Sequence, residues 1–270
     1  MRIILITTDS FPAQIALEPL LKNHIHEIVG VLIVSPLKGT RMAQLRRFAQ
    51  LMINKTSTKF LLLKFLECYL YPRWARFRSL IESFLLVEIK FELIRFIKRT
   101  HTPCLRISDV NSASTKAWVR DKHPELLLSA YGTQILDAEF LNLAPSKVNL
   151  HGGLLPEYRG SAPYFWMLAN GSNTVGISLH EMSPLVDWGP LFWSEKINIL
   201  DSLTVFGLHH ELSKLAARSL LHWINNLKDG IPHYSCAPLA MGPRFSVPTR
   251  EQVHKSGVKW FGWSDMARLL

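Results

Sequence analysis

The sequence predicts an α/β protein with a Rossmann-like, mostly parallel sheet and a basic helical insertion. Short apolar runs alternate with helical patterns from the first residues onward, which is the order expected of a parallel sheet. The excess positive charge is confined to one segment of helix-forming residues between the second and third apolar runs. With 270 residues, 48% of them hydrophobic, the chain can fill the core of such a fold.

The first half of the chain supplies most of the predicted sheet. Residues 2–7 and 27–34 are short apolar runs that predict buried strands, and residues 12–21 predict the helix between them. The run at residues 2–7 is too short for a signal sequence and is better explained as a first strand. Further strands are predicted at 104–107, 125–130 and 148–151, with helical turns at 113–121 and 138–143.

The second half is predicted to add a helix at 164–170, strands at 175–182 and 190–199, and a long helix at 201–227. Residues 1–230 are therefore expected to form one domain, interrupted by an insertion at 38–99. Residues 231–270 would form a C-terminal extension.

The insertion holds the whole charge excess of the chain. Residues 38–99 contain 14 Lys or Arg and four Glu, whereas the chain as a whole has a net charge of +10. The composition allows a helical subdomain with a solvated cationic face. It also allows docking to a membrane surface through an amphipathic basic helix with aromatic anchors, or binding to RNA or another polyanion.

Several classes of function are disfavoured by the sequence. The three cysteines are scattered and fit neither a disulfide framework nor a zinc pattern, so no metal site is expected and a cytoplasmic location is favoured. The turn at residues 7–12 contains no glycine, which argues against dinucleotide binding.

Three polar residues stand out as candidate catalytic groups. Asn149 and His151 are two residues apart in a predicted strand, so their side chains project from the same face. A loop rich in Gly and Pro follows them, and Asp187 lies in a second loop between two predicted strands. An amide donor, an imidazole and a carboxylate suit acyl transfer, in which an oxyanion must be held and a proton moved.

The segments around these residues resemble the catalytic domain of the folate-dependent formyltransferases. That group includes methionyl-tRNA formyltransferase, glycinamide ribonucleotide transformylase and the sugar-nucleotide N-formyltransferases. The likeness covers most of residues 1–36 and 100–228. It is carried by residues 148–163, Asn170-Gly171, residues 176–180, and Asp187 with Gly189-Pro190.

The resemblance implies a donor, a reaction and a role for each residue. The donor would be 10-formyltetrahydrofolate, and the acceptor a primary amine. Asn149 would donate to the formyl oxygen, His151 would stabilise the oxyanion, and Asp187 would orient His151 and relay a proton through water. The folate pteridine would lie against seven residues of two loops: Gln134, Ile135, Leu136, Ser183, Pro184, Leu185 and Val186.

The acceptor is the least defined part of this interpretation. Many relatives carry Ser at the position of Gly153 and a small residue at that of Trp188, so the pocket is expected to differ. The extension after the last helix is too short for the β-barrel of the tRNA-specific relatives, which favours a small amine or an amino-sugar nucleotide. The alternatives are initiator tRNA, hydrolysis of 10-formyltetrahydrofolate, and a membrane-associated binding protein without turnover. Any membrane contact would be made through residues 38–99 at the inner face of the membrane.

Overall fold

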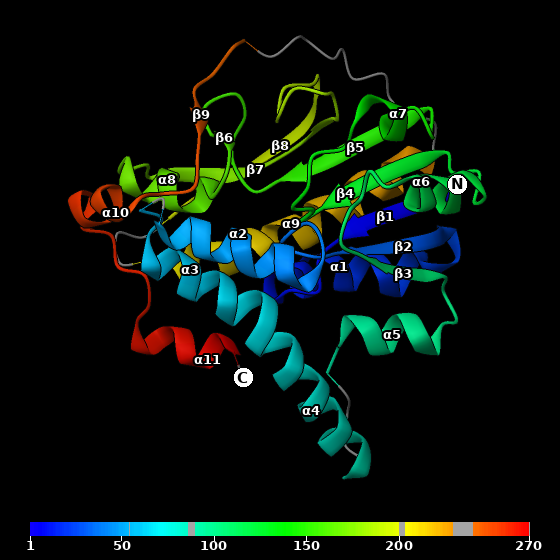
Figure 1. Ribbon diagram of the computed structural model, residues 1–270, viewed down its shortest axis with the longest axis horizontal. Coiled ribbons are helices and arrows are strands. Elements are labelled where there is room, and N and C mark those ends of the chain that lie inside the picture. Colours follow the sequence, from blue (N-terminus) through cyan, green and yellow to red (C-terminus); the bar gives the residue numbers. More distant parts are fainter. Residues whose placement is uncertain (54, 86–89, 200–202, 229–239, 270) are drawn as a thin grey trace.

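The computed structural model describes residues 1–53, 55–85, 90–199, 203–228 and 240–269. Within these residues a seven-stranded sheet forms the centre of the molecule (Figure 1). In spatial order its strands are β3 (Cys104–Ile107), β2 (Ile28–Val34), β1 (Ile3–Thr7), β4 (Leu126–Ala130), β5 (Ser146–His151), β7 (Thr174–Glu181) and β8 (Leu191–Asn198).

The sheet is parallel on one side and antiparallel on the other. Strands β3, β2, β1, β4 and β5 run parallel to one another, whereas β7 runs antiparallel to β5 and to β8. All five residues of β1 and of β4 are buried, as expected for central strands covered on both faces. The predicted Rossmann-like, mostly parallel sheet is confirmed.

Helices cover both faces of the sheet. Ile3 and Leu5 of β1 face a core built with α1 (Phe11–His24), α5 (Leu93–Arg99), α8 (Pro163–Ala169) and α9 (Val205–Lys228). Ile4 and Ile6 face the other core, built with α6 (Ala113–Arg120) and α7 (Ala138–Leu141). The alternation of side chains along β1 therefore separates the two layers.

The insertion at residues 38–99 is helical in its described part, as predicted. It contains α2 (Arg41–Ile53), α3 (Thr58–Phe65), the π-helical turn η2 (Leu66–Leu70), α4 (Tyr71–Phe84) and α5. No break separates α3, η2 and α4. Asp9, just after β1, ties this helix to the sheet, because its carboxylate lies 2.8 Å from Arg76 and 3.3 Å from Arg106. Residues 54 and 86–89 of the insertion lie outside the described residues.

The C-terminal extension packs back onto the domain. Strand β9 (Arg244–Phe245) pairs in parallel with β6 (Arg159–Gly160). It is followed by α10 (Arg250–Ser256), η3 (Trp263–Asp265) and α11 (Met266–Leu269), and Val253 and Trp260 join the main core. Residues 231–239 lie outside the described part. None of the described helices has the length and hydropathy that a membrane span requires.

Candidate active site

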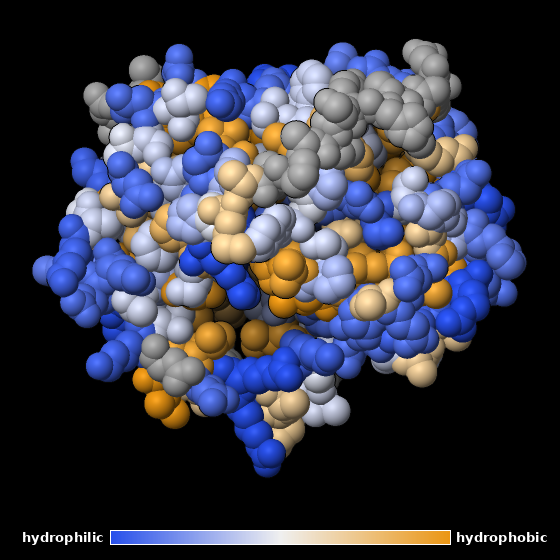
Figure 2. Space-filling model, turned by 90° about the horizontal axis from the view of Figure 1, so that it is seen from above, coloured by the Kyte–Doolittle hydropathy of each residue, from blue (hydrophilic) through white to orange (hydrophobic). Residues whose placement is uncertain are grey.

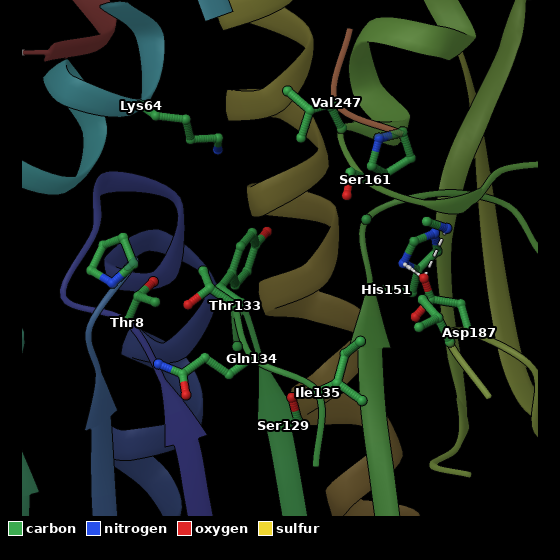
Figure 3. A pocket seen from close by; sticks show the side chains of 18 of the residues that line it. Thr8, Lys64, Ser129, Thr133, Gln134, Ile135, His151, Ser161, Asp187 and Val247 are labelled. Atoms are coloured by element: carbon green, nitrogen blue, oxygen red, sulfur yellow. Dashed lines mark hydrogen bonds and ion pairs between the residues drawn. The ribbon is translucent and has the colours of Figure 1, made fainter. Parts of the chain in front are cut away.

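A cavity of about 1280 Å³ opens at the carboxyl ends of β1, β4 and β5. Its walls come from the turn after β1, the segment after β4, the end of β5, and helix α3 of the insertion. Ligands of open α/β sheets bind at this edge of the sheet. In Figure 3, His151 and Asp187 lie on one side of the cavity, and Thr8 and Lys64 lie across from them.

Asn149 is held by a histidine on the neighbouring strand. The antiparallel register of β5 and β7 places Asn149 opposite His180, and the Asn149 Nδ2 atom lies 3.1 Å from His180 Nε2. His180 Nδ1 lies 2.8 Å from the Glu181 carbonyl oxygen, so Nδ1 carries the hydrogen and Nε2 accepts from Asn149. One amide hydrogen of Asn149 is used in this way, which leaves the second for a ligand in the cavity.

His151 lies between two hydrogen-bond acceptors. Its Nε2 atom donates to the Tyr158 carbonyl oxygen at 2.7 Å, so Nε2 carries the hydrogen in the neutral ring. Its Nδ1 atom lies 3.5 Å from Asp187 Oδ2 (Figure 3). Nδ1 is therefore the position at which this imidazole takes up or releases a proton, next to a carboxylate that stabilises the charged form.

The loop around Asp187 is fixed by the loop that follows β5. Asp187 has a positive φ of 47°, a conformation that side-chain-bearing residues adopt only when the surroundings hold it. Its carboxylate accepts from the Gly160 N–H at 2.9 Å. The Arg159 guanidinium donates to the carbonyl oxygens of Val186 at 2.9 Å and Asp187 at 3.2 Å, and it lies over the Trp188 ring.

These contacts set the charge states of the pair. Burial alone disfavours a charged carboxylate, but His151, the nearby His180 ring and the hydrogen bond from the Gly160 N–H lower the pKa of Asp187 to about 2. Burial also lowers the pKa of His151, and the Asp187 carboxylate and the Tyr158 carbonyl offset this only in part. At neutral pH the resting site therefore holds an ionised Asp187 and a neutral His151.

Six of the seven residues predicted to contact folate line the cavity: Gln134, Ile135, Leu136, Ser183, Leu185 and Val186. The Gln134 amide donates to the carbonyl oxygens of Ser35 and Ser108 and accepts a hydrogen bond from the Val110 N–H. The side chain therefore stabilises the loop that follows β4. Pro184 lies elsewhere. Together with Trp188 it lines a separate pocket of about 290 Å³.

Gly153 occupies a position without room for a side chain. A Cβ atom there would lie 2.6 Å from Pro163 Cβ and 3.2 Å from His151 Nε2. A serine at this position would require Pro163 or His151 to move.

Two groups of site residues were missed from the sequence. The first is His180, which lines the cavity and orients Asn149. The second group is a buried cluster in which the Glu67 carboxylate lies 2.7 Å from Lys64 Nζ and 2.6 Å from His209 Nδ1. The sequence signal for His180 and for Glu67 is a polar residue inside an apolar pattern. Such a signal does not show which residue the side chain contacts in the fold.

The described residues contain no group of three His, Cys, Asp or Glu side chains arranged to hold a metal ion. At the end of the mostly parallel sheet, the cavity brings together the amide of Asn149, the imidazoles of His151 and His180, and the carboxylate of Asp187. Such groups are suited to addition to a carbonyl group, which needs a donor for the oxyanion and a base for the proton.

Comparison with known proteins identifies the class of enzyme that the sequence resemblance implies. Residues 1–224 match the model of the formyl transferase family, and the chain belongs to that family. It is a formyl group transferase. The resemblance deduced from residues 148–190 is thereby confirmed.

Solved structures share the fold at low sequence identity. A likely sugar N-formyltransferase from Mycobacterium tuberculosis is 18% identical, with a TM-score of 0.55 over 91% of this chain and 75% of that one. Glycinamide ribonucleotide transformylase 1 from Symbiobacterium toebii is 14% identical, with a TM-score of 0.57 over 85% of this chain and 88% of that one. A 4-N formyltransferase from Francisella tularensis is 16% identical, with a TM-score of 0.53 over 91% and 76%.

Proposed function

We propose that this protein transfers the formyl group of 10-formyltetrahydrofolate to the primary amine of an amino sugar. The observation that carries the proposal is the arrangement of Asn149, His151 and Asp187 around one cavity in a chain of the formyl transferase family. Sugar N-formyltransferases among the structures with this fold favour an amino sugar as the acceptor class.

The donor would lie along the loops at residues 134–136 and 183–186. Residues of both loops line the cavity, where they offer backbone groups and the apolar side chains of Ile135, Leu185 and Val186. Such a surface suits a flat heterocycle that hydrogen-bonds to main-chain groups. The formyl oxygen would accept the free amide hydrogen of Asn149.

In the first step the amine nitrogen attacks the formyl carbon, so a C–N bond forms and the carbonyl oxygen becomes an oxyanion. Asn149 would stabilise that oxyanion with its free amide hydrogen, and His151 would add positive charge beside it once Nδ1 takes up a proton. Preorganised donors of this kind reduce the barrier because they need no rearrangement of water.

In the second step the proton of the new ammonium group has to leave. His151 Nδ1 is neutral at rest and faces Asp187, so it can take this proton directly or through water, and the carboxylate stabilises the imidazolium. The proton then passes to the folate nitrogen as its bond to the formyl carbon breaks. The products are a formamide and tetrahydrofolate.

The test is transfer of labelled formyl from 10-formyltetrahydrofolate to a panel of amino sugars, their nucleotide derivatives and Met-tRNA. We expect a labelled formamide with an amino-sugar acceptor and little free formate. Formate release at the same rate with and without amines would contradict the proposal and favour a hydrolase. Transfer to Met-tRNA alone would contradict the acceptor class.

A further inference from the structure

Helix α4 presents an apolar face to solvent. Its large exposed side chains recur at helical spacing: Leu70 just before the helix, then Trp74, Phe77, Ile81 and Phe84. Phe77 is 56% exposed and Phe84 is 86% exposed. The helix leaves the body of the molecule and points downward in Figure 1, so no described element covers this face. A row of large exposed apolar side chains along one helix face marks an interaction surface.

The charges of the insertion are sorted between its inside and its surface. Of its four acidic residues, the three that the structure describes, Glu67, Glu82 and Glu92, are all buried. Lys59 and Arg73 are exposed. They lie one helical turn from the exposed apolar residues of α3 and α4. The described surface of the insertion therefore combines apolar side chains and cations without an exposed carboxylate.

This combination favours an anionic lipid bilayer as the occupant. Cations bind lipid phosphates, while aliphatic and aromatic side chains enter the boundary with the acyl chains. RNA would use the cations but would gain little from aliphatic residues such as Leu80 and Ile81. In a symmetric dimer the same cationic surface would face its own copy and be repelled.

The apolar face reaches the catalytic cavity. Phe65 and Leu45 both line the cavity, yet they are 48% and 64% exposed, so they stand at its mouth. Phe65 stacks on Tyr69, which also lines the cavity and directly precedes Leu70 at the start of the exposed face. Figure 2 shows a hollow with hydrophobic side chains inside it on the face seen from above.

The cavity offers little for a nucleotide. Among its described lining residues the Lys and Arg side chains are those of Lys64 and Arg244, and Lys64 is already bonded to Glu67. The wall that the insertion contributes includes Leu51, Phe60 and Leu61. A diphosphate would find few cations here, whereas a hydrocarbon chain would find an apolar path to the outside.

We propose that the exposed face of α3, η2 and α4 docks the enzyme on an anionic bilayer and that the cavity receives the amine of an amphiphile from that bilayer. The apolar part of the acceptor would pass between Leu45 and Phe65. The reaction on the amine rests on the proposed function, whereas the docking surface does not.

Docking is tested by flotation with vesicles of phosphatidylglycerol and phosphatidylcholine, compared with vesicles of phosphatidylcholine alone. We expect the protein to float with the anionic vesicles. The double variant Phe77→Asp, Phe84→Asp should bind at least about tenfold more weakly. Trp263→Asp is the matched control, because Trp263 is a 95% exposed aromatic residue outside the insertion. The proposal is overturned if the parent protein does not float, floats equally with both vesicles, or floats equally well after the double substitution.

The acceptor is tested with the dodecyl and methyl glycosides of one amino sugar. We expect kcat/KM for formamide formation to be at least about tenfold higher with the dodecyl glycoside, and Phe65→Ser to narrow that ratio. Equal kcat/KM for the two glycosides would overturn the inference while the proposed function stood. If no formamide forms from either glycoside, the proposed function itself is contradicted. The docking surface is then still tested by the flotation experiment.

Discussion

At the active site, hydrogen-bond partners decide which nitrogen of each histidine carries a hydrogen. The Tyr158 carbonyl places the hydrogen of His151 on Nε2, and the Glu181 carbonyl places that of His180 on Nδ1. As a result His180 accepts from Asn149, and His151 keeps Nδ1 for proton uptake beside Asp187. Two backbone carbonyls thus fix the two tautomers, so that His180 orients Asn149 while Nδ1 of His151 is left to take up a proton.

Replacing Asn149 should reduce catalysis without unfolding the protein. Loss of one oxyanion donor costs about 10²–10³ in kcat, so we expect that drop in formamide formation by Asn149→Ala. Asn226→Ala is the control, because Asn226 makes a similar contact with His222 at 3.0 Å on α9, away from the cavity. Comparable kinetics for the two variants would argue against the oxyanion role.

Replacing Asp187 should lower the pKa of His151 further. The carboxylate favours the imidazolium, so its removal in Asp187→Asn leaves burial unopposed. We expect the ring of His151, followed by NMR in labelled protein and assigned with His151→Gln, to titrate at lower pH in the variant. A pKa that stays the same or rises would show that Asp187 does not govern the charge of His151.

Gly153→Ser should destabilise the protein. The added Cβ would overlap Pro163, and overpacking of this kind costs about 1–3 kcal/mol. Gly152→Ser is the neighbouring control, because a Cβ at Gly152 would come no closer than 3.9 Å to Pro163. Chemical denaturation measures both free energies of unfolding, and an equal loss in the two variants would exclude steric overlap as the cause.

Part of this candidate site can be predicted from the amino-acid sequence alone. Asn149 and His151 are two residues apart on one strand, and Asp187 lies in the loop between the next two predicted strands of the chain. This pattern predicts a group of polar residues that the structure brings together around one cavity. The role of His180 could not be predicted, because it depends on the register between β5 and β7, which no local pattern encodes.

At the level of elements, the insertion is joined to the domain by the π-helical turn η2. The turn carries Glu67, which is 1% exposed and bonded to Lys64 and to His209 of α9. Burial alone would raise the pKa of Glu67, but His209 and Lys64 lower it to about 2. The carboxylate therefore stabilises the fold above about pH 4, and this contribution is lost as the pH falls toward 2.

Glu67→Ala should destabilise the protein by about 3–5 kcal/mol at neutral pH, because it removes a buried carboxylate from buried His209 and half-buried Lys64. The loss relative to the parent protein should shrink as the pH falls toward 2. Glu251→Ala removes an exposed ion pair with Lys255 and should change stability by less than about 1 kcal/mol. A small effect of Glu67→Ala at neutral pH would mean that the cluster does not hold η2 in place.

The helical character of the insertion can be predicted from the sequence, but the placement of its helices against the rest of the domain cannot. Helix-forming residues with interleaved apolar and cationic side chains predict the helical character of residues 38–99. The continuity of α3, η2 and α4, and the position of Lys64 in the cavity wall, depend on contacts with α9 and with Asp9 that lie far away in the sequence.

At the scale of the whole molecule, chemistry and surface charge are divided between two parts of one chain. The mostly parallel sheet and the loops at its carboxyl edge supply Asn149, His151 and Asp187. The insertion supplies the charge excess and one wall of the same cavity. On the proposed function, the insertion can influence the choice of acceptor while the sheet and its loops carry the reaction.

The most direct test compares the parent protein with the triple variant Asn149→Ala, His151→Ala, Asp187→Ala in transfer of labelled formyl from 10-formyltetrahydrofolate to an amino-sugar acceptor. We predict a labelled formamide from the parent and none above background from the triple variant, with both proteins folded by circular dichroism. Equal formamide formation by the two proteins would contradict the assignment of catalysis to these three residues.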